Sequence, residues 1–303
     1  MEVFKLQVSE EWEGSRLDKY LSTNLDFVSR SYIQKIIKED NVTVNGKKEK
    51  GKYLVKEEDH IILYLPDSVE PELKAENIPL EILYEDSDVI VINKPKDMVV
   101  HPAPGHYSGT LVNALMYHCK DSLSGINGIL RPGIVHRIDK DTTGSIIVCK
   151  NDFSHEKIAK QLKDHTIVRR YRAICHGVLK EDEYTINAPI GRHPTERKKM
   201  AINEKNGKSA ITHIKVLQRL NNATYVECRL ETGRTHQIRV HMASISHPLL
   251  GDDIYCSIKN NFKLQGQTLH AYILGFNHPK TNEYIETIAP LPEYFEKLIH
   301  KLS

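Results

Sequence analysis

The chain has 303 residues, of which 40% are apolar and 27% are charged, and its formal net charge is only +2. These values are ordinary for a soluble globular protein, no stretch approaches the roughly 18 consecutive apolar residues of a transmembrane helix, and the first residues lack the basic-then-apolar order of a secretory signal. Five scattered cysteines without a Cys-x-x-Cys pair argue against a disulfide framework and a zinc ribbon. We therefore expect a cytoplasmic protein that does not associate with membranes.

The first 65 residues have the pattern of a small separate unit with both helices and strands. Helical spacing begins at Arg16, and Ser29 is a suitable N-cap for a second helix over residues 30–39, where three isoleucines share one face. A β-branched strand then closes on an Asn-Gly turn, which is the strongest short signal for a β-hairpin. Residues 61–65 have the apolar pattern of another strand. This order predicts a small N-terminal α/β domain.

The segment after this unit has the composition of a linker. Residues 66–79 are polar and acidic and contain three prolines. We therefore expect a first domain over residues 1–75, linker included, and a second over residues 76–303. Strand patterns in the second domain mostly follow one another without regular alternation with helices, which favours an α+β fold with a mainly antiparallel mixed sheet. Strands are expected at residues 89–93, 144–149, 168–175, 210–217, 223–230, 270–276 and 284–288, and helices at 110–119, 153–164, 235–244 and 293–302.

Basic residues are concentrated in three stretches of the chain. Residues 30–52 hold seven basic and three acidic side chains, residues 131–172 hold ten and five, and residues 192–219 hold eight and two. Clusters of this kind suit the phosphates of a nucleic acid, which supply affinity rather than sequence choice. A solvated lysine-rich face is the alternative interpretation of the first stretch. Within that stretch, Lys35 and Lys47 are candidates for RNA contact.

Residues 131–144 form the densest group of polar and turn-forming residues, immediately before an apolar strand. Loops positioned by a rigid strand often carry catalytic groups. His136 and Asp139 could be metal ligands, but a zinc site normally needs three or four protein ligands. His236 and His241 are five residues apart and do not share a helix face. We therefore expect no metal, and a salt-bridged turn before a strand is the remaining structural alternative for this segment.

The same segment carries a family resemblance. Residues 134–144 are similar to the signature of the RluA/RluD family of pseudouridine synthases, with Ile138 and Thr143 where the common family form has leucine and serine. Both replacements are mild. A second family block surrounds Tyr171, although the usual lysine two places before the tyrosine is Arg169 here. Two further blocks that match in order are residues 94–113 and 230–252.

The resemblance extends to the domain organisation. Residues 14–66 resemble the alpha-L RNA-binding domain, which occurs in a small-subunit ribosomal protein, in tyrosyl-tRNA synthetases and in several RNA-modifying enzymes. Residues 101–105 and 124–128 look most like the D-type branch, which modifies large-subunit ribosomal RNA. The resemblance therefore implies the pseudouridine synthase fold for the second domain, large-subunit ribosomal RNA or a pre-ribosomal particle as partner, and a reaction without cofactor or metal. We expect a monomer, although the sequence does not fix the oligomeric state.

This reaction needs an anionic oxygen. It breaks the bond between ribose carbon 1′ and uracil nitrogen 1, rotates the base and rejoins it at carbon 5, so an anion must attack an electrophilic carbon or take the 2′ proton. The resemblance implies Asp139 for this role, and an aspartate is already ionised at pH 7. Burial disfavours a carboxylate unless a cation offsets it. The resemblance implies Arg239 as that ion-pair partner, with Arg234 as the second choice.

The remaining roles are carried over from the family in the same way. Tyr171 is expected to pack against the reacting uracil and to be able to accept its carbon 5 proton. Arg137 is expected to fill the gap left by the everted base, with stabilisation of the charge of Asp139 as the competing role. His136 is expected to order the loop by hydrogen bonding rather than to act as a base. The other residues expected to contact RNA in this domain are Thr143 and Arg234.

Two alternative functions belong to different classes. One is a non-catalytic RNA-binding factor for ribosome assembly that keeps the enzyme fold, although a pure binder has no need of a carboxylate facing phosphates. The other is a different RNA-modifying enzyme with the same N-terminal module, such as a methyltransferase. The sequence contains no glycine-rich dinucleotide or P-loop fingerprint, which argues against dehydrogenases, NTPases and typical methyltransferases.

Overall fold

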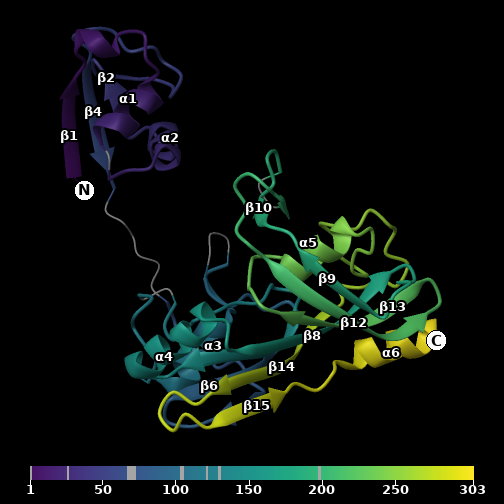
Figure 1. The fold of residues 1–303 in the computed structure, drawn as a ribbon. Helices are drawn as coiled ribbons and strands as arrows, with labels where there is room; N and C mark the ends of the chain where they lie inside the picture. Colours follow the sequence, from purple (N-terminus) through teal and green to yellow (C-terminus); the bar gives the residue numbers. More distant parts are fainter. Residues whose placement is uncertain are drawn as a thin grey trace. The chain divides into compact units, whose positions relative to one another are not determined.

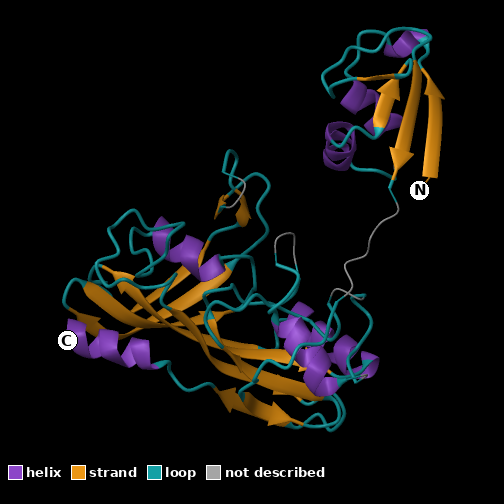
Figure 2. Ribbon diagram, turned by 180° about the vertical axis from the view of Figure 1, so that it is seen from behind, coloured by secondary structure: helices purple, strands orange, loops and turns teal. Residues whose placement is uncertain are grey.

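The chain folds into two compact units, Met1–Pro71 and Glu72–Ser303, as a computed structural model shows (Figures 1 and 2). Among the residues that this structure describes, no helix is both long enough and apolar enough to cross a membrane. The described residues are 2–25, 27–66, 73–102, 106–120, 122–128, 131–196 and 199–303.

The first unit packs its helices on an antiparallel sheet with strand order β1-β4-β2-β3. The expected cap is present, because the Ser29 hydroxyl accepts a hydrogen bond from the backbone N–H of Tyr32 at 3.3 Å. The sequence pattern does not predict strand β1, whose side chains are mostly exposed and give little apolar alternation. The elements are β1 (Glu2–Gln7), a 3-10 helix (Glu10–Trp12), α1 (Leu17–Asn24), α2 (Arg30–Lys38), β2 (Val42–Val44), β3 (Lys47–Lys48) and β4 (His60–Leu65).

A buried carboxylate joins the two helices of this unit. Both oxygens of Asp18 accept hydrogen bonds from Arg16, at 3.1 and 2.8 Å, while Arg30 and Gln34 of α2 donate to the same carboxylate at 2.9 and 2.7 Å. The hydrogen bond from Arg16 is the largest influence on the pKa of Asp18, and it holds that pKa well below its usual value although burial acts in the opposite direction. The carboxylate therefore stays ionised and fixes both arginines.

The second unit is built on one large mixed sheet with strand order β5-β6-β7-β14-β8-β13-β12-β9, and β15 pairs with β14. Strands β7 and β14 run parallel, and the pairings of β14 with β8 and of β8 with β13 are antiparallel. The elements are β5 (Ile82–Glu85), β6 (Val89–Lys94), α3 (Leu111–Cys119), β7 (Thr143–Cys149), α4 (Asp152–Lys163), β8 (Val168–His176), β9 (Glu183–Asn187), β10 (Ile190–Arg192), β11 (Met200–Ile202), β12 (Ile211–Leu220), β13 (Ala223–Leu230), α5 (Gln237–Ser244), β14 (Leu269–Asn277), β15 (Tyr284–Ile288) and α6 (Glu293–Leu302).

Helices cover both faces of this sheet (Figures 1 and 2). On β6, Ile90 and Ile92 join the cluster that contains α3, whereas Val89 and Val91 join the cluster that contains α4. Because both faces of β6 are buried, its sequence is a continuous apolar run rather than an alternation. In the other half of the sheet, α5 and α6 lie on opposite faces. The expectation of an α+β fold with a mainly antiparallel sheet is thereby confirmed.

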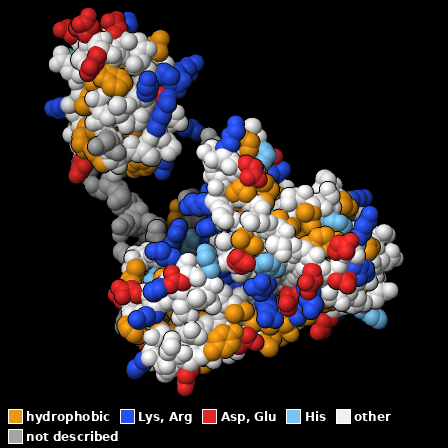
Figure 3. Space-filling model, in the orientation of Figure 1, with side chains coloured by type: hydrophobic (Ala, Val, Ile, Leu, Met, Phe, Trp, Pro, Cys, Tyr) orange, Lys and Arg blue, Asp and Glu red, His pale blue; other side chains and the backbone are white. Residues whose placement is uncertain are grey.

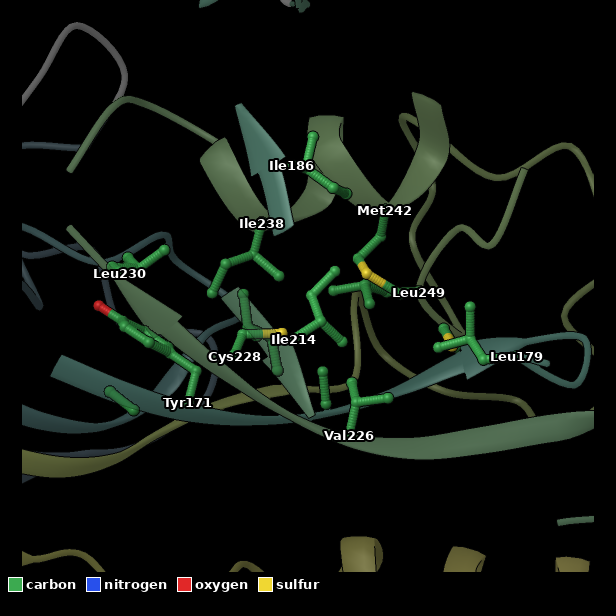
Figure 4. Close-up of a cluster of buried hydrophobic side chains, with 14 of the residues drawn as sticks. Tyr171, Leu179, Ile186, Ile214, Val226, Cys228, Leu230, Ile238, Met242 and Leu249 are labelled. Atoms are coloured by element: carbon green, nitrogen blue, oxygen red, sulfur yellow. The ribbon is translucent and has the colours of Figure 1, made fainter. Parts of the chain in front are cut away.

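The core beneath α5 adjoins the candidate site (Figure 4). Ile238 and Met242 of α5 point toward Ile214 and the neighbouring strand residues of the sheet. Each fully buried side chain of this size contributes about 1.5–3 kcal/mol relative to its exposed state. Tyr171 lies at one end of this cluster beside Leu230, and its hydroxyl points away from the other members. The cluster therefore fixes the Tyr171 ring while leaving its polar end outside.

Every strand and helix expected after residue 80 is present within a few residues of its expected bounds. The sequence pattern does not predict β5, β9, β10 or β11, which are short and only partly buried. Helix α5 begins at Gln237 rather than at residue 235, because His236 adopts a left-handed conformation with φ of 57°. That conformation is uncommon for a residue other than glycine.

Part of the expected linker packs against the second unit. Residues 67–72 lie outside the described residues. Leu73 is buried in the cluster that contains α3, and the carbonyl of Asn113 accepts a hydrogen bond from the Glu76 N–H at 2.9 Å. The prediction of a linker is therefore wrong for residues 73–79. Their mostly polar composition gives no sign that Leu73 packs into the core of the second unit.

A glycine sets the approach of strands β7 and β14. Gly144 has a φ of 106°, and a Cβ at this position would lie 2.3 Å from the carbonyl oxygen of Ala271. Gly144 pairs with Ala271 in the parallel register. No larger residue fits without moving one of the two backbones. Strand β7 directly follows the loop that carries Asp139, and β14 pairs with β7.

We predict that Gly144→Ala lowers the free energy of unfolding by on the order of 3 kcal/mol, through backbone strain and overpacking together. Urea-induced unfolding measures the change. Gly125→Ala is the control, because a Cβ at Gly125 meets nothing within 4 Å, and this control should stay within about 0.5 kcal/mol of the wild type. Equal stability of the two variants would contradict the strain argument.

Candidate active site

The loop before β7 is held in place at several points. The Thr142 N–H donates to the Asp139 carbonyl at 3.0 Å, closing a turn. The Nε2 atom of His136 accepts the backbone N–H of Ile147 at 3.1 Å and ties the loop to the centre of β7. Ile138 is buried in the cluster beneath α5. These contacts hold Asp139 in the loop that leads into β7, an interior strand of the sheet.

A buried lysine supports the same loop. The ammonium of Lys94 donates to the carbonyls of Pro95, Met98 and Lys140 at 2.7, 2.9 and 2.9 Å, and the side chain is fully buried. Burial lowers the pKa of Lys94 to about 7, although the charge of Asp141 and that of Asp139 act in the opposite direction. Lys94 therefore joins the turn after β6 to the loop before β7.

Arg239 lies between two carboxylates. Its Nη1 donates to Oδ2 of Asp139 at 3.0 Å, while its Nε and Nη2 form a bidentate pair with Asp252 at 2.7 and 2.8 Å. The Asp252 side chain is fully buried, and that of Arg239 is 5% exposed. Bidentate carboxylate pairing suits the planar guanidinium. Asp252 therefore fixes the orientation in which Arg239 meets Asp139.

The electrostatics of this group favour the charged forms. Burial alone lowers the pKa of Arg239, but the hydrogen bond and charge of Asp252, followed by the charge of Asp139, raise it above its usual value. Burial would raise the pKa of Asp252, and the hydrogen bond from Arg239 reverses this effect and holds that pKa below its usual value. Arg239 and Asp252 therefore stabilise each other in their charged forms.

His236 and Tyr255 complete the surroundings of Asp139. The Nε2 atom of His236 lies 3.7 Å from Oδ1 of Asp139, which is beyond hydrogen-bonding distance. Its Nδ1 atom lies 2.7 Å from the Tyr255 hydroxyl, and that hydroxyl accepts the Met200 N–H at 2.8 Å. Burial is the main reason that the pKa of His236 lies below its usual value. Within the described part of the chain, Oδ1 of Asp139 accepts no hydrogen bond and is open to a substrate.

A cleft of about 480 Å³ adjoins these residues. Asp139 and Tyr171 both line it, and both also line a narrower cavity of about 60 Å³ beside Arg239. Tyr171 is 8% exposed, and burial raises its pKa while the nearby Arg169 opposes the shift. The carboxylate of Asp139, the ring of Tyr171 and the guanidinium of Arg239 therefore line the narrower cavity together, an arrangement that suits acid–base or nucleophilic chemistry.

The other residues expected at the site differ in how each of them meets the cleft. Arg137 is exposed and lines the cleft beside Asp139. Arg234 also lines the cleft, but its Nε donates to the Ser209 carbonyl at 2.9 Å rather than to the carboxylate. His136 is partly buried and also lines the cleft, and burial lowers its pKa to about 3, which suits its role as a neutral hydrogen-bond acceptor.

The structure does not bring Thr143 to this cleft. Its side chain is buried, and its hydroxyl lies 2.8 Å from Nδ1 of His270. It lines a different cavity, together with Tyr294. Its position as the first residue of β7 explains the difference, because side chains alternate between the faces of a strand.

Lys35 and Lys47 belong to the first unit, where both are exposed. Lys35 lies 3.7 Å from Glu39 on the same helix, a weak surface pair. Figure 3 shows the basic side chains of this unit gathered along one side, while acidic ones gather at one end. Lys38, Lys48, Lys50 and Lys52 line an open groove of about 580 Å³ in this unit.

Among the described residues, Asp86, Asp88 and His278 form a group with the spacing of metal ligands. The Asp86 carboxylate accepts the backbone N–H groups of Asp88 and Val89 at 2.7 and 2.9 Å and lies 2.8 Å from Nε2 of His278. These hydrogen bonds belong to a turn before β6 and explain why the three residues lie close together. We therefore assign no metal to it.

The chain matches known proteins along its whole length. Residues 88–244 match the family described as RNA pseudouridylate synthase, and residues 15–61 match the S4 domain. The chain belongs to the RNA pseudouridine synthase family. An RNA pseudouridine synthase of Bacillus subtilis is 49% identical over 302 residues, covering 100% of this chain and 99% of that protein. The resemblance inferred from the sequence motifs is thereby confirmed, as is the assignment to an isomerase family.

Further relatives agree with this assignment. The ribosomal large subunit pseudouridine synthase D of Zymomonas mobilis is 42% identical over 308 residues, covering 98% of this chain and 97% of that protein. The solved structure of human RNA pseudouridylate synthase domain containing 1 aligns with a TM-score of 0.57 at 26% identity, covering 79% of this chain and 97% of that one. The S4 match also agrees with the predicted N-terminal RNA-binding domain.

Sequence reasoning did not assign three residues that the structure brings to the site: Asp252, Tyr255 and Arg169. Asp252 ends one of the matched blocks, and Arg169 is a departure from the family pattern, so both carried a signal. Neither signal identifies a contact, because Asp252 and Arg239 are 13 residues apart in different elements and meet only through the turn that follows α5.

We predict that Asp252→Asn lowers the free energy of unfolding at pH 7 by on the order of 3 kcal/mol, because it removes one partner of a buried ion pair. The folded-state pKa of Asp252 is depressed, so its contribution is present above the unfolded pKa and is lost as the pH falls through the folded value. The difference from wild type should therefore shrink below about pH 4.

Chemical denaturation from pH 7 to pH 3 measures this difference. The control is Asp253→Asn, which removes an exposed neighbouring carboxylate and should follow the wild type at each pH. A difference for Asp252→Asn that stays constant across this range would show that the loss does not come from the ionised pair.

Proposed function

We propose that this chain isomerises uridines to pseudouridine in large-subunit ribosomal RNA, with Asp139 as the carboxylate that opens the glycosidic bond. The observation that carries the proposal is the Asp139 carboxylate, paired with Arg239 at 3.0 Å and facing a cleft lined by Tyr171. The names of the relatives support the RNA substrate. A ribosomal substrate also agrees with the cytoplasmic location expected from the sequence.

The geometry suits a reaction in which no group is imported. Asp139 presents an oxygen that Arg239 does not occupy, and this oxygen can attack ribose carbon 1′ or remove the 2′ proton. The bond from carbon 1′ to nitrogen 1 breaks, and its electron pair stays on the uracil. The uracil then rotates and bonds to carbon 1′ through carbon 5, and this step either releases the Asp139 oxygen from carbon 1′ or is accompanied by return of the 2′ proton from Asp139. Loss of the carbon 5 proton to a base and recovery of a proton at nitrogen 1 complete an isomerisation.

The uracil has to leave its stack before it can reach Asp139. Extruding a base costs a few kcal/mol, and the cost is least in loops. Arg137 is exposed at the mouth of the cleft, where it can occupy the space that the base leaves. The Tyr171 ring, fixed by the cluster beneath α5, offers the flat surface for the everted base, and its hydroxyl is the candidate acceptor of the carbon 5 proton.

The first unit supplies a separate RNA contact. Its basic residues are concentrated on α2 and the hairpin that follows, where side chains line an open groove. Lysines of this kind bind phosphates without reading sequence. We propose that this unit holds the ribosomal RNA while the second unit acts on the uridine.

We predict that Asp139→Asn and Asp139→Ala reduce pseudouridine formation below detection while RNA affinity changes little, because both remove the only anion proposed to react. Primer extension after carbodiimide treatment of large-subunit ribosomal RNA from cells lacking the protein detects the product. Filter binding with the same RNA measures the affinity.

Asp97→Asn serves as the matched control, since Asp97 is an exposed carboxylate that pairs with Lys140 in the same region. It should retain wild-type turnover. Substantial turnover by either Asp139 variant would refute the catalytic role. If the wild-type protein binds the RNA without forming pseudouridine, the non-catalytic assembly factor becomes the better interpretation.

We predict that the double substitution Lys35→Glu with Lys47→Glu weakens RNA binding and makes its salt dependence shallower, by about 0.7–0.9 in log–log slope for each phosphate that the protein no longer neutralises. Titrations at several salt concentrations measure both quantities. The double substitution Lys5→Glu with Lys19→Glu makes the same charge change at exposed positions outside residues 30–52. Equal weakening by the two pairs would mean that only net charge matters.

A further inference from the structure

Arg169 is a buried cation that the described part of the chain provides with no acidic partner. Its side chain belongs to β8, and the residue is 7% exposed. Its Nη2 donates to the Glu231 carbonyl at 3.1 Å, whereas its Nε has no hydrogen-bond partner among the described residues. Within the same ranges, Arg169 forms no ion pair with a carboxylate. Burial lowers its pKa, and so does the charge of Arg234.

Three other arginines of this unit have acidic partners. Arg170 and Arg172, on the opposite face of β8, lie 3.9 and 3.2 Å from the carboxylate of Glu227. Arg239 meets two carboxylates. An unpaired buried charge is costly even after the protein relaxes around it. Such an unfavourable charge is understandable in a protein when the charge binds a ligand. The unpaired N–H donors of a guanidinium suit an anion.

The position of Arg169 indicates which anion it meets. It is two residues before Tyr171, so the two side chains lie on one face of β8, and both line the cleft that Asp139 also lines. Room for the guanidinium comes from Gly233, where a Cβ would lie 2.5 Å from Nη1 of Arg169. The cation and the carboxylate thus share one cleft with the aromatic ring proposed to hold the base.

The proposed reaction creates an anion in this cleft. When the bond from carbon 1′ to nitrogen 1 breaks, the electron pair stays on the uracil and spreads to its carbonyl oxygens. Preorganised donors aimed at developing charge are among the largest contributions to catalysis. We propose that Arg169 binds the everted uracil and stabilises the negative charge that this ring carries until it rejoins the ribose through carbon 5. This inference rests on the proposed function of the chain.

Single-turnover kinetics with saturating protein test the role. Arg169→Gln should slow isomerisation by on the order of 100-fold while the Kd for RNA stays within about twofold. Arg169→Lys keeps the charge and should react at least tenfold faster than Arg169→Gln. Arg170→Gln is the matched control, because it removes the adjacent arginine from the opposite face of the same strand, and it should react like the wild type.

An RNA phosphate is the other anion that a guanidinium could bind, and the same measurements separate the two. If Arg169 binds a phosphate, Arg169→Gln would leave the rate constant at saturating protein unchanged. It would raise the Kd for RNA and make the salt dependence of binding shallower by about one in log–log slope. That result would overturn the proposal. Equally slow lysine and glutamine variants would also overturn it, since the charge would then be irrelevant.

A measurement without substrate tests the premise. Arg169→Met keeps the length of the side chain and removes its charge, so it should raise the melting temperature of the free protein if the cation is uncompensated. A lowered melting temperature would mean that the fold already satisfies Arg169, and the inference would fail. This result is independent of catalysis. A wild-type chain that forms no pseudouridine would instead refute the proposed function, so the two failures can be told apart.

Discussion

The contact between Arg239 and two carboxylates organises this site. A guanidinium has enough donors to bind one carboxylate bidentately and still reach another. Here Asp252 takes the bidentate position, and Asp139 receives the remaining donor. The orientation of Arg239 is therefore set by a residue whose side chain is fully buried. Asp139 gains a fixed cation while one of its oxygens stays open.

The surrounding structure maintains this arrangement from independent directions. Lys94 and His136 hold the loop of Asp139 through backbone contacts, and α5 carries Arg239 on a helix that also buries Ile238 and Met242 in the core. Loop and helix thus reach the site on separate supports. Such a scaffold limits the movement of the Asp139–Arg239 pair.

The sequence allows much of this to be predicted, and the physical reasons differ from one feature to another. The main strands and helices follow from apolar periodicity, which survives because their faces are buried. Asp139 and Arg239 are 100 residues apart, so only the resemblance to a family pairs them. The role of Asp252 could not be predicted, because its contact depends on the turn after α5. The burial of Leu73 could not be predicted either, because one apolar side chain in a polar segment leaves no periodic signal.

The alternation along β8 has a consequence for how this sequence can change. Arg169 and Tyr171 point into the cleft, whereas Arg170 and Arg172 point to the far face and meet Glu227. A strand has a period of two, so a single inserted or deleted residue before Tyr171 would exchange the two sets. The cleft would then receive the arginines that need an acidic neighbour. The strand can therefore accept substitutions far more readily than a change in length, which only the turns at either end can absorb.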